Sequence, residues 1–266
     1  MNLRVTVGQY YPIESVIHAL DPRVKLLGSF TFITMIFFAE SFFANLFCAF
    51  FIFSVTFASR VPFMLFLKGL KNILFILLFT LVLNIFLTPG EHCIFQIGII
   101  KITREGLFLA VKMAVRLVLL IISSACLTLT TPPLSLASAF EFFLSPFARF
   151  GLPAQEISMM MTIALRFIPT LTDETDKIIK AQKARGADFE TGGVKKRARA
   201  LVPVLVPLFV SCFKRAEDLA YAMEARCYRT DIKRSKMNGL KFIKKDFAAL
   251  GVIAVFAAGL LVIRKY

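Results

Sequence analysis

Two stretches decide how this chain is organised: residues 169–189, PTLTDETDKIIKAQKARGADF, and residues 195–228, KKRARALVPVLVPLFVSCFKRAEDLAYAMEARCY. Each has helical patterning and ends in a small residue, an arginine and a second small residue. The endings are Ala184, Arg185 and Gly186 in the first stretch, and Ala225, Arg226 and Cys227 in the second. Both stretches carry many charges, whereas most of the remaining chain is apolar. We therefore expect the pair to lie outside the apolar part and to meet a partner.

The composition is typical of a polytopic membrane protein. Of the 266 residues 58% are hydrophobic, 18% are charged and 30 are Phe, whereas a soluble domain is about half apolar and about a quarter charged. The net charge of +15 would suggest nucleic-acid binding in a soluble protein. In a membrane protein, excess Lys and Arg hold loops on the cytoplasmic side and lie against anionic lipid. We expect the lipid bilayer as a partner, and no nucleic acid.

The fold class that follows is an all-α polytopic membrane protein with about five transmembrane helices. Asp21 and Pro22 can begin the first helix as N-cap and first helical residue. The apolar run 24–59 is too long for one crossing of a hydrocarbon core of about 30 Å. We interpret it as two short helices that turn near Glu40, although one long tilted helix is an alternative. The further spans are expected at about 72–87, 105–131 and 246–263.

Charge divides the chain into four segments. Residues 1–23 form a cytoplasmic N-terminal segment and 24–131 a membrane domain of about four spans. Residues 132–240 form a cytoplasmic domain of about three amphipathic helices, and 241–266 the last span. Residues 132–241 contain 18 basic and 11 acidic residues, an excess that indicates the cytoplasmic side. We expect this domain to divide at 151–153, at Pro169 and at the loop 187–194, and residues 91–104 could form a short external hairpin.

Nothing in the sequence indicates an enzyme. The two His residues are not accompanied by a Ser/His/Asp set or an HExxH motif, and the GxxxxGK[ST] loop that binds ATP is absent. The five Cys residues form no CxxC pair and no Cys/His cluster, which argues against a disulfide framework and a zinc site. We expect no cofactor and no metal, so any ATP would be bound by a partner subunit.

The second amphipathic stretch carries one continuous apolar stripe. Its residues recur at steps of three and four, as on one face of a helix. Pro203 and Pro207 lie in its first part and should bend the helix. From about Arg199 to Arg226 such a helix would be about 42 Å long. Core packing explains part of this stripe, but the length favours a further partner surface.

Each terminal arginine is placed where a helix end favours a cation, because the last carbonyl groups lack partners and the dipole is negative there. A single such ending means little. Two endings about forty residues apart suggest a two-pronged plug for two similar receptors. The small neighbours leave the planar guanidinium free to pair with a carboxylate through two hydrogen bonds.

At these residues the chain resembles the transmembrane T components of energy-coupling factor (ECF) importers, a family that includes the cobalt-transport protein CbiQ. The resemblance covers nearly the whole chain. It is carried by HALDPRVKLL at 18–27, ALRFIPTL at 164–171, KAQKARGADF at 180–189 and VPLFVSCFKRAEDLAYAMEARCY at 206–228. The family hallmark is two Ala-Arg-Gly-like motifs on cytoplasmic coupling helices. Cys227 stands where the family commonly has Gly, so the second cap could differ in geometry.

The resemblance implies a coupling subunit in a bacterial cell (inner or plasma) membrane. Two ATP-binding cassette ATPase subunits would each receive one coupling-helix end, at 184–186 and 225–227. A separate substrate-binding S component would rest on the apolar stripe and release a vitamin or metal ion into the cell. The stripe residues implied for this contact are Leu205, Leu208, Phe209, Cys212 and Phe213.

Two other readings stay open. A conventional ABC-importer permease would carry its own substrate path and a single coupling helix with an EAA-type Gly loop, which the sequence does not show. A scaffold or assembly factor would have no transport role.

Overall fold

The computed structural model describes residues 10–88, 93–97, 100–151, 153–189, 193–229 and 242–265. The chain divides into two compact units. The apolar unit comprises residues 8–142 and 240–266, and the amphipathic unit comprises residues 1–7 and 143–239. The predicted four-segment division concerns membrane and cytoplasm, and it stays a prediction. Residues 1–9 of the predicted N-terminal segment and residues 230–241 lie outside the described part.

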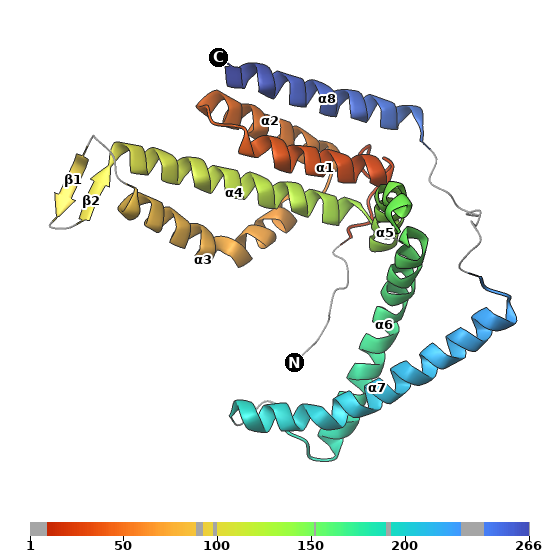
Figure 1. The fold of residues 1–266 in the computed structure, drawn as a ribbon. Coiled ribbons are helices and arrows are strands. Elements are labelled where there is room, and N and C mark those ends of the chain that lie inside the picture. The colour runs from red at the N-terminus through yellow and green to blue at the C-terminus, as the bar shows by residue number, and fades with distance from the viewer. Residues whose placement is uncertain are drawn as a thin grey trace. The chain divides into compact units, whose positions relative to one another are not determined.

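The apolar unit is built from helices and one small hairpin (Figure 1). Its elements are α1 (Pro22–Phe37), α2 (Phe42–Ser59), α3 (Phe63–Leu87), β1 (Cys93–Ile97), β2 (Ile100–Thr103), α4 (Arg104–Thr130) and α8 (Lys244–Lys265). The strands pair antiparallel, with Ile97 opposite Ile100, which confirms a hairpin within the predicted stretch, whereas its external side stays a prediction. α5 (Pro133–Leu144) and the short 3-10 helix η1 (Ser145–Phe150) follow α4.

Among the described residues, α2, α4 and α8 are each long and apolar enough to cross a membrane. α3 becomes a fourth such span if its two parts, bent by 61°, are taken as one. α1 has 16 residues, about 24 Å of helix, and is the shortest of the five expected spans. The expected all-α polytopic class is confirmed, and the described helices supply three or four candidate spans where about five were expected.

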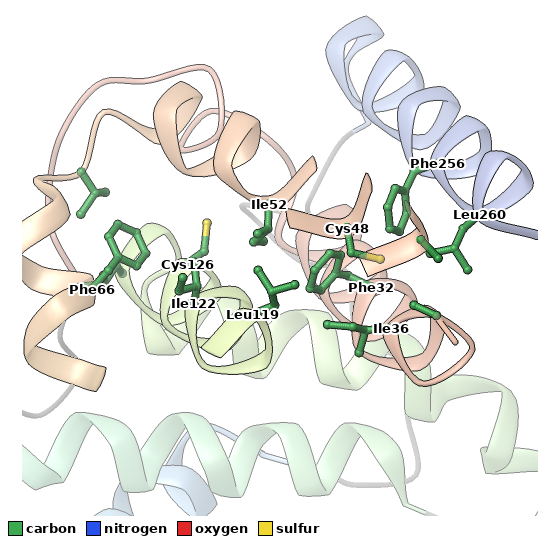
Figure 2. Close-up of a cluster of buried hydrophobic side chains, with 14 residues drawn as sticks. Phe32, Ile36, Cys48, Ile52, Phe66, Leu119, Ile122, Cys126, Phe256 and Leu260 are labelled. Carbon is green, nitrogen blue, oxygen red and sulfur yellow. The ribbon is translucent and has the colours of Figure 1, made fainter. Parts of the chain in front are cut away.

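The core of the apolar unit lies between α1, α2, α4 and α8, with α3 at one edge (Figure 2). Phe256 of α8 stacks on Phe51 with ring centroids 4.1 Å apart and is flanked by Phe32 and Phe47. Stacked aromatic pairs stabilise by about 0.5–1.5 kcal/mol beyond their buried area. This aromatic group therefore packs α8 against α1 and α2.

The turn between α1 and α2 confirms the prediction of two short helices. Arg116 of α4 donates from Nη2 to the carbonyl of Ala39 in this turn, at 3.1 Å. Its guanidinium also lies 5.6 Å from the ring centroid of Phe37. Asn45 donates to the same carbonyl at 3.3 Å. Arg116 thus stabilises the turn between α1 and α2 by a hydrogen bond to a backbone carbonyl. This contact explains why a basic residue lies within the apolar helix α4.

Asp246 joins the beginnings of α1 and α8. Its two carboxylate oxygens accept the backbone N–H groups of Asp21 at 2.8 Å and of Ile243 at 2.7 Å. Asp21 in turn caps α1 by accepting the N–H of Arg23, as the sequence predicted. Both helices therefore begin at the same end of the apolar unit, and α4 ends there, since Lys25 donates to the carbonyl of Thr130.

The amphipathic unit holds two long helices, α6 (Ala154–Ala184) and α7 (Val194–Ala225). The expected division at Pro169 is wrong, because α6 is one helix of 31 residues that contains Pro169 in its interior. A proline removes one backbone hydrogen bond and bends a helix, and the bonds on both sides of Pro169 are sufficient to continue this one. α7 likewise contains Pro203 and Pro207 and has 32 residues, about 48 Å.

Candidate docking site

A polar contact joins the two long helices. Glu174 of α6 accepts a hydrogen bond from Ser211 Oγ at 2.6 Å and forms an ion pair with Arg215 Nη2 at 2.9 Å. Ser211 and Arg215 are one turn apart on α7, so they lie on the same face. We call these three residues the crossing cluster. It fixes which turn of α6 meets which turn of α7.

The crossing cluster favours an ionised carboxylate. The hydrogen bond from Ser211, with the charge of Arg215 as a further cause, lowers the pKa of Glu174 below its ordinary value of 4.5. The side chains of Arg215 and Glu174 are 38% and 25% exposed, and ion pairs with this exposure contribute only about 0.2–1 kcal/mol. The cluster is therefore more important for the register of the two helices than for the stability of the fold.

The two predicted docking ends are equally far along the sequence from the Glu174–Arg215 ion pair. Glu174 precedes Ala184 by ten residues and Arg215 precedes Ala225 by ten residues. Ten helical residues correspond to about 15 Å. α6 and α7 therefore each extend by about the same length beyond the ion pair. One docking end lies on α6 and the other on α7 (Figure 1).

At the first end, Arg185 is the C-cap residue of α6. Its backbone N–H still bonds to carbonyls of the last turn. Gly186 has a φ of +86°, and its N–H donates to Lys183 at 3.0 Å, while that of Ala187 donates to Gln182 at 2.9 Å. This is the C-cap with a left-handed residue that commonly ends a helix at glycine.

The second end has the same cap. Arg226 is the C-cap residue of α7. The N–H of Cys227 donates to Glu224 at 2.8 Å and that of Tyr228 donates to Met223 at 2.9 Å. Cys227 has a φ of +55°, in the left-handed region. The expectation that the cap could differ without glycine is wrong, because Cys227 adopts the glycine conformation.

Both triplets are accessible. Ala184, Arg185 and Gly186 are exposed, and so are Ala225, Arg226 and Cys227. Within the described ranges, neither Arg185 nor Arg226 has a carboxylate at ion-pair distance. The structure thus presents two guanidinium groups in matching positions on two matching caps. Their assignment as ATPase-docking residues stays a prediction.

The apolar stripe of α7 divides into two faces. Three of its five predicted contact residues, Leu205, Phe209 and Phe213, are 48%, 61% and 69% exposed. Leu208 and Cys212 are only partly exposed. The structure adds four exposed apolar side chains that sequence reasoning missed: Leu201, Val202, Val206 and Val210. Val202, Val206 and Val210 recur at steps of four residues, and this pattern could have identified these three as one helix face.

The described part of the chain contains no group of three or more His, Cys, Asp or Glu residues placed to hold a metal ion. The predictions of no cofactor, and of ATP bound by partner subunits, stay predictions.

Comparisons with known proteins agree with the geometry. The family model described as cobalt transport protein, CbiQ, matches residues 14–237. Three relatives carry the name energy-coupling factor transporter transmembrane protein EcfT. The relative from Clostridium kluyveri is 51% identical over 246 residues, 92% of this chain and 91% of the relative. The relative from Thermosediminibacter oceani is 48% identical over 255 residues, 96% of each chain, and the one from Bacillus subtilis is 45% identical over 258 residues, 97% of each.

Apolar spanning helices and these matches together define a multi-pass membrane transport component. More particularly, the chain belongs to the family of energy-coupling factor transporter transmembrane proteins, the T components of ECF transporters. It is thus a transport component rather than an enzyme, and one part of a transporter with several subunits. The resemblance read from the sequence is confirmed.

Proposed function

We propose that the chain transmits ATP-driven movement of two ATP-binding cassette ATPase subunits to a substrate-binding S component, for uptake of a vitamin or a metal ion. The observation that carries this proposal is the pair of matching caps. Arg185 and Arg226 occupy the same cap position, about 15 Å along their helices from the crossing cluster. Two equivalent ends suit two similar receptors, and ATP would be bound only in those receptors.

The crossing cluster supports a mechanical role. Two helices fixed to each other at one point can pass on a displacement of their ends as a change in angle or position at that point. The exposed apolar side chains of α7 lie before the crossing cluster, from Leu201 to Val210, and continue to Phe213, which lies between Ser211 and Arg215 in the sequence. A row of adjacent exposed apolar side chains that the rest of its own unit leaves uncovered favours a protein partner. We assign the S component to it.

For the orientation, the proposal places the amphipathic unit and the N-terminus in the cytoplasm of a bacterial cell whose plasma membrane holds the apolar unit. Arg23, Lys25, Lys244 and Lys245 belong to the end at which α1 and α8 begin. An excess of basic residues at helix ends is typical of the cytoplasmic side. At the opposite end, Arg264 lies over the ring of Phe38 at 5.1 Å.

Co-purification from the native membrane tests the proposal. We expect the tagged chain to retain two ATPase subunits and a small substrate-binding membrane protein. A chain that is isolated alone and binds its substrate by itself would instead be a conventional ABC-importer permease. A chain that retains neither ATPase nor substrate binder would be a scaffold.

A further inference from the structure

The apolar unit contains a cavity of about 390 Å³ between α1, α2, α4 and α8. It lies beside the aromatic core, since Phe32, Phe51 and Ile52 contribute to its wall. Its volume is within the range of small-molecule pockets, about 300–1,000 Å³. The site proposed for docking involves only the amphipathic unit, so this cavity has no role in it.

The cavity is elongated along the helices. On α1 its lining residues are Val24, Lys25, Gly28, Ser29 and Phe32, and on α8 they are Lys245, Ala248, Ala249, Val252 and Ile253. On both helices these residues recur over two turns of one face, about 12 Å. The space exists because four of them are small. The two helices come close where α1 has glycine, since a Cβ at Gly28 would lie 2.9 Å from Ile253 Cδ1.

The cavity is open at its side. Val252 is 57% exposed and Val16 is 63% exposed, although both line it. α8 has little of its surface covered by the rest of the chain. In a membrane the opening would therefore meet lipid, and the long direction of the cavity would run with the acyl chains.

Two basic residues mark one end of the cavity. Lys245 is exposed in the first turn of α8. Lys25 is held in place because its Nζ donates to the carbonyls of His18 at 3.1 Å and Thr130 at 3.0 Å. An ammonium group has three N–H donors, so one donor of Lys25 is left by these two bonds. The nearby carboxylate of Asp246 has both oxygens bonded to backbone N–H groups.

We propose that this cavity holds one acyl chain of an anionic phospholipid whose phosphate binds Lys245 and Lys25. The apolar length suits a hydrocarbon chain, and the basic end suits a phosphate at headgroup level. The inference rests on the membrane location alone and not on the coupling role.

The lipid would take the place of side chains between the beginnings of α1 and α8. These beginnings are already joined through Asp246 and Asp21. A bound lipid adds an apolar contact along two further turns. The consequence is a membrane unit whose first and last helices are packed together partly by lipid.

Native mass spectrometry of the full chain tests the proposal, with phosphatidylglycerol and zwitterionic phosphatidylcholine as probes. We expect one phosphatidylglycerol molecule to be retained about thirtyfold more than phosphatidylcholine, the combined effect of about two lysines near an anionic lipid. Lys245→Glu should remove this preference, whereas Lys244→Glu, an exposed neighbour outside the cavity lining, should keep it. Equal effects of the two variants would overturn the assignment of the phosphate.

A second pair of variants tests the acyl chain. Ala249→Phe fills the cavity and should lower retention of both lipids, whereas Ala254→Phe, on an exposed position of α8 outside the lining, should not. If Ala249→Phe does not fold by circular dichroism, the smaller change Ala248→Leu makes the same test. Unchanged retention in the filled variants would overturn the proposal. Displacement of phosphatidylglycerol by inorganic phosphate would also overturn it, because that result indicates a free anion site.

Discussion

Gly186 and Cys227 occupy the same position in the caps of α6 and α7, both with positive φ, at +86° and +55°. Each donates its N–H to the carbonyl three residues earlier. A left-handed conformation costs a residue with a Cβ about 1–2 kcal/mol, a cost that glycine avoids. The second cap therefore stores strain that the first does not, although the two are superficially alike.

Exchanging these residues should shift cap stability in opposite directions. Cys227→Gly relieves the strain but makes the unfolded chain more flexible, so we expect a net gain of about 0.5–1 kcal/mol. Gly186→Cys should lose a similar amount, and no atom lies within 4 Å of a Cβ there to add a clash. Hydrogen exchange of the amides in the last turn of each helix measures both. Cys227→Ala is the control, because it removes the thiol and keeps the strain.

Charge reversal at the two helix ends should weaken ATPase association. Arg185→Glu and Arg226→Glu are each expected to reduce it, and the double variant to abolish it, because an acidic pocket would then meet a carboxylate. The measurement is co-purification of the ATPase subunits, with substrate uptake as a second readout. Lys214→Glu reverses an exposed charge on α7 away from the end and should have little effect. An intact complex in the double variant would refute the docking assignment.

The crossing cluster should show a measurable coupling. In a double-mutant cycle with Glu174→Gln and Arg215→Gln, we expect a coupling energy of about 0.2–1 kcal/mol. The pKa of Glu174 is lowered in the folded chain, so its contribution is present above the ordinary value of 4.5 and is lost as the pH falls through the lowered value. Thermal unfolding at several pH values should show this loss in the wild type and not in Glu174→Gln. A pH dependence that Glu174→Gln leaves unchanged would assign it to another group.

The carbonyl of Ala39 accepts hydrogen bonds from two donors, Arg116 and Asn45, and the stability costs of removing them should be non-additive. Arg116→Met or Asn45→Ala alone leaves the carbonyl one partner, so each should cost about 1 kcal/mol. The double variant leaves a buried carbonyl without either donor, and its cost should exceed the sum of the single variants by about 1 kcal/mol or more. Unfolding free energies in detergent measure this. Strict additivity would show that water or lipid replaces the lost donors.

Removal of the Asp246 carboxylate should loosen the last helix. Two backbone N–H groups lose a charged acceptor, for which we expect a cost of about 3–5 kcal/mol in Asp246→Ala. Asp246→Asn keeps one acceptor oxygen and should lose less. Limited proteolysis near the beginning of α8 reports the effect, and Asp218→Ala, on an exposed face of α7, is the matched control. Equal protease resistance of both alanine variants would contradict the role of Asp246.

Much of the fold could be predicted because the signals are local. Asp21 and Pro22 begin α1 as expected, and the apolar run 24–59 divides into two helices at Glu40. The helix ends at Arg185 and Arg226 were also found from local pattern. Pro169 was misinterpreted, because a proline signals a break only when its neighbours cannot continue the helix.

The contacts between distant residues could not be predicted. Ser211 and Arg215 gave no sign of meeting Glu174, because nothing in the spacing of one helix fixes its register on another. Asp246 was regarded only as the start of the last span, yet it reaches the N–H of a residue 225 positions earlier. Val202, Val206 and Val210 were within reach of pattern analysis, but their exposure depends on which face α6 covers.

The sequence by itself determined that this is a helical membrane protein with two arginine-ended amphipathic helices, because hydropathy, charge and helix caps are properties of neighbouring residues. Only the tertiary structure decided where those helices cross and that a cavity with lysines at one end lies between α1 and α8. Such features depend on which side chains from distant segments pack together, and packing is set by shape and register in three dimensions.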